Sequence, residues 1–199
     1  MTGPKRALRS ELIAARMRLP ADARAARSHA IAERLEDVPG FAAARVVAVY
    51  APLGAEVDPG EIVLRAAARG VALVYPRSLR GQRRLAFVRA VPGDLAPGPL
   101  GALEPPADAP EIPPGGIDAV LVPCVGVSAD GGRLGRGGGY YDATLPALPR
   151  AIRIGLVFEA QLVPSLPREA HDALLDAAVT EARVLLFTRD RESQGASTT

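Results

Sequence analysis

The sequence predicts a three-layer α/β/α domain built on a mostly parallel sheet. Short apolar runs of strand length alternate with helical patterns, and a glycine-rich segment directly follows one of these runs. Alternating strands and helices are typical of parallel sheets covered by helices, which bind ligands at the carboxyl ends of their strands. No apolar run approaches the ~20 residues that a membrane-spanning helix needs, so we expect no contact with a membrane.

Composition narrows the class of protein further. A chain of 199 residues suits one core, and we expect a single domain over 1–190 followed by a flexible polar tail over 191–199. The lone cysteine, Cys124, excludes an intramolecular disulfide and is interpreted as a small buried residue; its isolation favours a reducing compartment, so we expect a cytoplasmic protein. A net charge of +2 and the absence of tryptophan argue against nucleic-acid binding. We expect a monomer that acts on small molecules.

Apolar periodicity and turn residues give the expected order of elements. Helices are predicted over 4–19, 21–35, 59–69 and 141–148, and strands over 45–50, 71–75, 84–89, 117–122, 152–158 and 184–187. The first two strands flank the third helix as a right-handed crossover, and the strand over 84–89 is expected to be antiparallel. The stretch 92–116, rich in proline and glycine, is expected to be irregular, with no strand pairing of its own.

The residues 131–142, here called the glycine segment, read G-G-R-L-G-R-G-G-G-Y-Y-D and contain six glycines. We interpret the whole segment as one loop between the strand over 117–122 and a helix. Glycines expose backbone N–H groups that can cradle phosphate oxygens, and Arg133 and Arg136 offer planar guanidinium groups that grip a phosphate twice. The segment is neither a P-loop nor a dinucleotide fingerprint. A plain surface turn would not need these arginines, tyrosines and the aspartate, which together suit a polyanion with a metal ion.

The segment R-L-G-R-G-G-G-Y-Y-D (133–142) resembles the signature of the 5-formyltetrahydrofolate cyclo-ligase family, also called 5,10-methenyltetrahydrofolate synthetase. Similar motifs occur along nearly the whole chain: K-R-A-L-R (5–9), Y-A-P-L-G-A-E-V-D (50–58), Y-P-R (75–77), L-E-P (103–105) and H-D-A-L-L-D (171–176). The resemblance implies a fold similar to that of sugar-phosphate isomerases and CoA transferases. It also implies ATP- and magnesium-dependent closure of 5-formyltetrahydrofolate to the 5,10-methenyl form through phosphorylation of the formyl oxygen, with release of ADP and phosphate.

The resemblance also implies roles for particular residues. Arg136 and Tyr141 match catalytic positions. The positions that match the ATP site are Lys5, Arg9, Arg133, Leu134, Gly135, Arg136, Gly137, Gly138, Gly139, Tyr140 and Tyr141. Those that match the folate site are Arg9, Glu56, Arg136 and Tyr140. Asp142 and Asp176 match the carboxylates that hold Mg²⁺, and Asp172, one helical turn earlier, could share that task.

Three departures from the family pattern leave other readings open. Val127-Ser128 stands where the family usually has Phe-Asp, so a carboxylate is lost there unless Asp130 compensates; Gly138 replaces a lysine of some members; and Leu103 replaces an aromatic residue. The alternatives are a paralogue that keeps the ATP loop but acts on another N-formyl or heterocyclic substrate, and a non-catalytic phosphate-binding module on the same fold.

Overall fold

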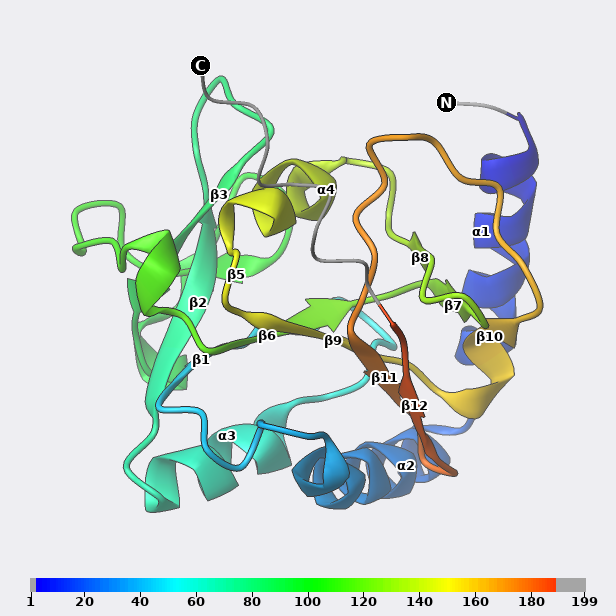
Figure 1. Cartoon of the computed structure of the whole chain (residues 1–199), viewed down its shortest axis with the longest axis horizontal. Helices are drawn as coiled ribbons and strands as arrows, with labels where there is room; N and C mark the ends of the chain where they lie inside the picture. Colours follow the sequence, from blue (N-terminus) through cyan, green and yellow to red (C-terminus); the bar gives the residue numbers. More distant parts are fainter. Residues whose placement is uncertain (1–2, 189–199) are drawn as a thin grey trace.

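The main sheet has seven strands in the order β12-β11-β9-β6-β1-β2-β3, in a computed structural model that describes residues 3–188 (Figure 1). Its strands are β1 (Val46–Ala48), β2 (Ala72–Ser78), β3 (Leu85–Arg89), β6 (Ala119–Pro123), β9 (Ile152–Leu156), β11 (Ala177–Val179) and β12 (Val184–Leu186). Neighbours from β11 to β2 run parallel, and the edge strands β3 and β12 are antiparallel. The prediction of a mostly parallel sheet, with an antiparallel strand at 84–89, is therefore confirmed.

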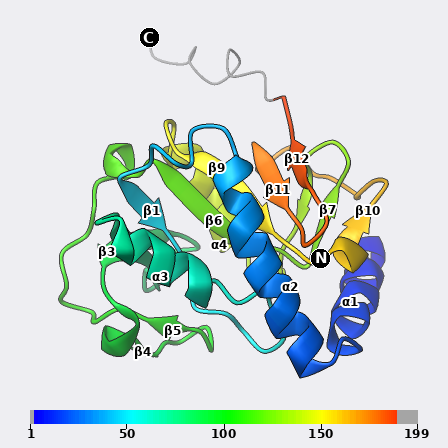
Figure 2. The same cartoon turned by 90° about the horizontal axis from the view of Figure 1, so that it is seen from below.

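Helices lie on both faces of this sheet. The helices are α1 (Gly3–Met17), α2 (Ala21–Arg34), α3 (Gly60–Ala68) and α4 (Tyr140–Thr144). α2 and α3 cover one face and α4 lies on the other, while α1 stands beside a small second sheet (Figures 1 and 2). The expected helix over 141–148 is shorter than predicted, because a 3-10 turn over Leu145–Ala147 replaces its second half at Pro146. Within 3–188, no helix is both long and apolar enough to span a membrane.

Alternating side chains on the strands divide the core between the two faces. Val47 and Leu121 belong to the cluster that packs under α2 and α3. Their neighbours Ala48 and Val122 belong to the cluster that packs toward α4, together with Leu145. Apolar runs in a sheet covered on both sides show no polar alternation, which is why these strands read as continuous hydrophobic stretches.

The expectation that 92–116 forms no strand pairing is wrong. β4 (Ala96–Pro97) and β5 (Leu103–Glu104) pair as a small antiparallel sheet. The Glu104 carboxylate accepts hydrogen bonds at 3.0 Å from both the backbone N–H and the hydroxyl of Ser78, so this arm is fastened to β2. This pairing is only two residues long and is held in place by a hydrogen bond to another strand, so it requires no apolar periodicity. It could not be predicted from the sequence for that reason.

The second sheet also escaped prediction. It contains β10 (Leu162–Val163), β7 (Gly126–Ser128) and β8 (Arg133–Leu134), and it packs beside α1. Strand β11 was missed as well, since three apolar residues carry no readable period. The predicted tail, 191–199, and the predicted end of the domain at 190 lie outside the described residues.

Candidate active site

A pocket of about 520 Å³ opens beyond the carboxyl ends of β1 and β6. The chain segments that line it are far apart in sequence: Lys5 and Arg9 from α1, Tyr50 to Glu56 after β1, Arg83 and Leu85 from the β2–β3 hairpin, Leu100 to Glu104 from the β4–β5 arm, Arg133 to Asp142, and Glu169 to Asp172. Parallel strands bring their carboxyl ends to one edge of the sheet, so the loops that follow them meet there. Every predicted ATP- and folate-site residue lines this pocket.

The glycine segment is not one loop, which corrects the prediction. Gly131 and Gly132 form the turn between β7 and β8, where Gly131 has a φ of 80° and its N–H donates to the Ser128 carbonyl at 3.0 Å. Arg133 and Leu134 form β8 and are buried. Only 135–139 remains as a loop at the pocket, and α4 begins directly after it.

This shorter loop needs glycine for two reasons. Gly137 and Gly139 have φ angles of 101° and 72°, in the left-handed region that strongly favours glycine. A Cβ atom on Gly135 would lie 2.6 Å from Nη1 of Arg133, so a side chain there would displace that guanidinium. The backbone of the loop is thus exposed toward the pocket without side chains covering it.

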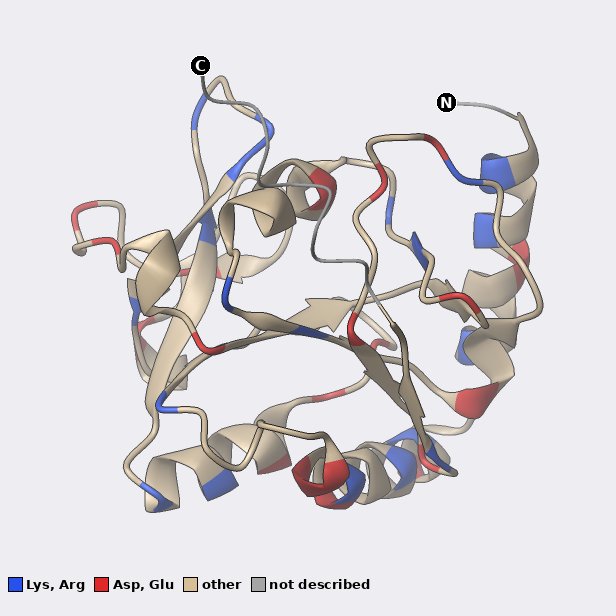
Figure 3. Cartoon of the chain, in the orientation of Figure 1, with Lys and Arg blue, Asp and Glu red and all other residues tan. Residues whose placement is uncertain are grey.

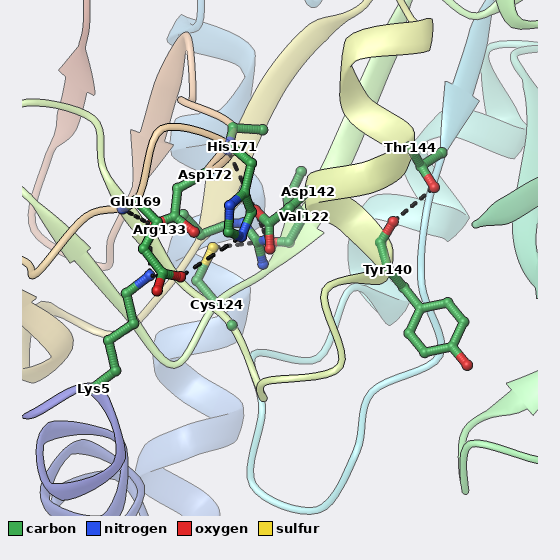
Figure 4. Close-up of polar contacts among 12 residues, drawn as sticks. Lys5, Val122, Cys124, Arg133, Tyr140, Asp142, Thr144, Glu169, His171 and Asp172 are labelled. Carbon is green, nitrogen blue, oxygen red and sulfur yellow. Dashed lines mark hydrogen bonds and ion pairs between the residues drawn. The ribbon is translucent and has the colours of Figure 1, made fainter. Parts of the chain in front are cut away.

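Arg133 braces the base of the pocket. Its guanidinium donates to Oδ1 of Asp142 at 2.7 Å, and only 3% of its side chain is exposed (Figure 4). The guanidinium carbon also lies 5.7 Å from the centroid of the Tyr141 ring, in cation–π geometry. Asp142 accepts a further, long hydrogen bond of 3.4 Å from the Ala173 N–H. These contacts join β8, α4 and the loop after residue 168.

The two tyrosines differ in environment. Tyr141 packs against the core cluster below α4, and burial raises the pKa of its hydroxyl far above its ordinary value. That hydroxyl therefore stays protonated at neutral pH and can donate a hydrogen bond but cannot serve as a base. Tyr140 is half-buried, and its ring extends away from the cluster of charged side chains that includes Lys5 (Figure 4).

Lys5 is held by two acids on the opposite wall of the pocket. Its ammonium lies 2.6 Å from Oδ2 of Asp172 and 3.1 Å from Oε2 of Glu169 (Figure 4). Burial lowers the pKa of Lys5, but hydrogen bonds to the two carboxylates outweigh it and raise that pKa. For Asp172 burial raises the pKa, and the hydrogen bond from Lys5 outweighs it and lowers that pKa. Both groups are therefore charged at neutral pH.

Arg9 lies one helical turn further along α1. Its Nε donates to the Gly135 carbonyl at 2.7 Å, which ties the helix to the glycine loop. Its Nη1 is buried and has no hydrogen-bond partner among residues 3–188. A buried guanidinium nitrogen without an acceptor is costly, so this atom marks a place where an anion would be stabilised.

Arg136 and Glu56 form an ion pair across the pocket. Nη1 of Arg136 lies 3.1 Å from Oε1 of Glu56; 51% of the arginine side chain is exposed, but only 4% of the glutamate side chain. The other carboxylate oxygen accepts the Leu53 N–H at 2.9 Å, so the backbone fixes Glu56. Because the arginine side chain is half exposed, it is the partner that can move, and Glu56 would keep its hydrogen bond from Leu53.

The structure does not bring the two predicted magnesium carboxylates together. Asp142 lines the pocket, but Asp176 lies at the amino end of β11, where its carboxylate accepts the Arg153 N–H at 2.8 Å, and it borders a separate hollow with Ile152 and Leu186. Asp172 does line the pocket. Residues 171–176 are not helical, so the helical-turn argument that placed Asp172 beside Asp176 was wrong.

Oxygen ligands for a divalent cation are nevertheless present. Within the described part of the chain, ligand atoms of Glu169, His171 and Asp172 lie within 4.8 Å of one another. Two of these three groups already hold a cation, the Lys5 ammonium. Carboxylates suit Mg²⁺, which keeps several of its waters and uses few protein ligands. Glu169 had no signal in the sequence, because only the folded chain places it opposite Lys5.

Two further predictions concern residues near the glycine segment. Cys124 is buried directly after β6, as expected, and burial raises the pKa of its thiol to about 12, so it is not a nucleophile at neutral pH. Asp130 does not supply a carboxylate to the pocket in place of Ser128. It accepts a hydrogen bond from the Ser128 hydroxyl at 2.5 Å and pairs with Arg168 at 2.8 Å, outside the residues that line the pocket.

Comparisons with known proteins agree with this geometry. Residues 1–181 match the model of the 5-formyltetrahydrofolate cyclo-ligase family. The 5-formyltetrahydrofolate cyclo-ligase of Mycolicibacterium smegmatis is 34% identical over 73% of this chain and 78% of its own, and that of Escherichia coli K12 is 32% identical over 77% and 87%. The solved 5,10-methenyltetrahydrofolate synthetase of Aquifex aeolicus superposes with a TM-score of 0.80 at 28% identity, covering 98% of this chain and 96% of its own. The chain belongs to the 5-formyltetrahydrofolate cyclo-ligase family of enzymes.

Proposed function

We propose that this protein converts 5-formyltetrahydrofolate to 5,10-methenyltetrahydrofolate and cleaves ATP to ADP and phosphate. The observation that carries the proposal is the meeting, in one pocket, of Lys5, Arg9, the loop 135–139 and the Arg136–Glu56 pair. These groups come from separate parts of the chain, and together they offer positive charge, free backbone N–H groups and a fixed acid. Such a set suits a triphosphate beside a second, neutral reacting group.

The cations at one end of the pocket would bind the phosphates of ATP. Arg9 has an unpartnered buried Nη1, and Lys5 can exchange its carboxylate partners for phosphate oxygens. The loop 135–139 adds N–H groups on a backbone that glycine leaves uncovered. Phosphoryl transfer needs mostly positioning and neutralisation of charge, which these groups supply.

The reaction then follows from the chemistry of an amide. The formyl oxygen is a poor leaving group, so it first attacks the γ-phosphorus of ATP; a new O–P bond forms and ADP leaves. The arylamine nitrogen next attacks the formyl carbon, phosphate departs with the C–O electron pair, and the nitrogen loses its proton. Both steps require near-contact alignment of the reacting atoms more than acid–base catalysis.

Arg136 and Glu56 fit the two sides of this reaction. The exposed Arg136 can move from Glu56 to the phosphoryl group, because Glu56 keeps its hydrogen bond from Leu53. Glu56 is then free to accept a hydrogen bond from the folate. Tyr140 and the protonated Tyr141 hydroxyl complete the wall between the two substrates.

The donor set also fits Mg²⁺, and we propose Asp172 and Glu169 as the residues that would hold it. Both carboxylates already hold a cation, while Asp142 on the same pocket wall is engaged by Arg133. When bound, Mg²⁺ would neutralise charge on the ATP phosphates. Lys5, displaced from the carboxylates, would remain close enough to bind a phosphate oxygen.

The decisive test is an absorbance assay for the methenyl product from 5-formyltetrahydrofolate, ATP and Mg²⁺, with ADP measured in parallel. We expect equal amounts of methenyl product and ADP. ADP released only with another N-formyl compound would support a paralogue, and ATP binding without turnover of any such compound would support a non-catalytic module. Light scattering and cell fractionation would test the accompanying proposal of a cytoplasmic monomer.

A further inference from the structure

Positive charge is concentrated in the loop of the β2–β3 hairpin. Residues 79–84 contain Arg80, Arg83 and Arg84, all exposed, and no acid (Figure 3). Among the described residues, these three side chains have no ion-pair or hydrogen-bond partner, whereas Arg77 at the base of the same hairpin pairs with Glu111 at 2.9 Å. The loop therefore offers cations to a partner outside the chain.

The hairpin holds Arg83 at the rim of the pocket. The Leu79 N–H donates to the Arg84 carbonyl at 3.1 Å, and the tight turn between these two residues contains Gly81, whose φ is 71°. Arg83 lies in the bend just before β3, and both Arg83 and Leu85, the first residue of β3, line the pocket. The Leu85 N–H donates to the Thr144 hydroxyl at 2.9 Å, which fixes this part of the hairpin to α4.

The two ends of the pocket differ in what they can bind. Lys5 and Arg9 lie at the α1 end, and the hairpin lies on the other side of α4 (Figure 1). Besides Arg83, the hairpin and the β4–β5 arm fastened to it contribute apolar side chains to the pocket lining: Leu85, and Leu100 and Leu103, which are 43% and 45% exposed. The nearby acid, Glu104, is engaged by Ser78.

An apolar wall that ends in an unpaired guanidinium suits an aromatic group that carries a carboxylate. The proposed folate substrate has this form beyond its reacting ring, since an aminobenzoyl group leads to glutamate. ATP places its negative charge among the cations at the α1 end, so it leaves Arg83 without an anion. A guanidinium binds a carboxylate in a planar, two-point geometry that a folate tail can meet.

We propose that Arg83 binds a carboxylate of the glutamate tail of the folate and so determines preference for substrates that carry this tail. The inference rests on the proposed function. Additional γ-linked glutamates would extend into the positive field of Arg80 and Arg84, so affinity should rise with the number of glutamates. Because the loop is exposed, this preference should weaken with salt.

The experiment compares wild type, Arg83→Gln and Arg89→Gln on three folates: a 5-formyl substrate without glutamate, with one glutamate, and with three γ-linked glutamates. Arg89 is the matched control, since it is an exposed arginine of the same hairpin, at the far end of β3 and outside the pocket lining. We expect Arg83→Gln to raise the KM about fivefold for the one-glutamate folate and more for the three-glutamate folate. The KM for the folate without glutamate, the KM for ATP and kcat should change less than twofold.

The outcomes separate two claims. An equal rise of KM on all three folates, or a rise of the KM for ATP, would overturn the role of Arg83 in binding the tail, and so would an equal effect of Arg89→Gln. Loss of the salt dependence of KM in Arg83→Gln, with wild-type values for the folate without glutamate, would support it. Failure of the wild-type protein to convert any of the three folates would instead refute the proposed function.

Discussion

Arg133 and Arg136 stand three residues apart in the glycine segment, and each pairs with an acid, but the pairs are built in opposite ways. In the first pair the arginine is buried, with 3% of its side chain exposed, against 18% for Asp142. In the second the acid is buried, and half of the arginine side chain is exposed. The two arginines are the same residue type, so their burial separates their roles: Arg133 is fixed to its partner, whereas Arg136 can exchange Glu56 for a ligand.

The largest effect is expected for Arg136→Ala. Loss of a cation that stabilises a transferring phosphoryl group should lower turnover by roughly 100-fold or more. The protein should still fold, because the Arg136 side chain is half exposed and contributes little packing, and Glu56 keeps its hydrogen bond from Leu53. Steady-state kinetics and thermal unfolding measure the two effects separately. Near-normal turnover in the folded variant would place Arg136 outside the mechanism. The contrast between a structural Arg133 and a functional Arg136 would then be wrong.

Arg133→Met should act mainly on stability. Removing one partner of a buried ion pair leaves Asp142 uncompensated, and we expect a loss of about 2–4 kcal/mol in the free energy of unfolding. The control is Arg168→Met, which breaks an ion pair whose side chains are 41% and 55% exposed and should cost less than about 1 kcal/mol. Equal losses in urea denaturation would show that burial does not distinguish the two pairs.

Lys5 resembles Arg136 rather than Arg133, because it is a cation at the pocket that is paired with acids from a distant part of the chain and can exchange them for a ligand. It is the only lysine in the sequence. If its compact ammonium fits between phosphate oxygens, Lys5→Arg should raise the KM for ATP several-fold, roughly fivefold, with little change for the folate. Arg6→Lys, at the neighbouring exposed position of α1, is the control. Wild-type kinetics in Lys5→Arg would contradict the need for an ammonium.

The change expected to be smallest concerns Asp130, an exposed residue in the β7–β8 turn just before the glycine segment, and it depends on pH. The hydrogen bond from Ser128, followed by that from Arg168, lowers the pKa of Asp130 from 3.8 to about 2. A carboxylate with a lowered pKa contributes stability above pH 3.8, and this contribution is lost as the pH falls to about 2. The difference in melting temperature between wild type and Asp130→Asn should therefore be small at pH 5 and vanish near pH 2. If the difference in melting temperature were the same at pH 5 and pH 2, the Asp130 carboxylate would not stabilise the β7–β8 turn.

Much of the site was predictable because its chemistry is local. The composition of residues 135–139, four glycines and Arg136, is enough to predict a phosphate-binding loop. The family motifs predicted that Lys5, Arg9 and Glu56 belong to the same site. The division of the glycine segment was not predictable. Gly131 and Gly132 look like loop glycines, but β7 supplies a partner for Arg133 and Leu134, and pairing between short strands leaves no period in the sequence.

The magnesium carboxylates show the same limit. Asp172 and Asp176 lie four residues apart, which in a helix would place them on one face. The chain there is not helical, and at about 3.3 Å per residue four extended residues can span roughly 13 Å. Asp172 consequently reaches the pocket, while Asp176 stays at the amino end of β11.

The fold class, the family and most of the groups that line the pocket can be read from the sequence alone, because apolar periodicity and residue chemistry act over a few neighbouring residues. Which of these groups are held by a partner and which are available to a ligand depends on the folded chain. It buried Arg133 and exposed Arg136, set Glu169 opposite Lys5, and, in the part of the chain that the structure describes, gave Arg83 at the rim no acid partner. These outcomes depend on contacts between residues far apart in the chain, such as Lys5 and Glu169, which are 164 positions apart, and no local pattern encodes such contacts.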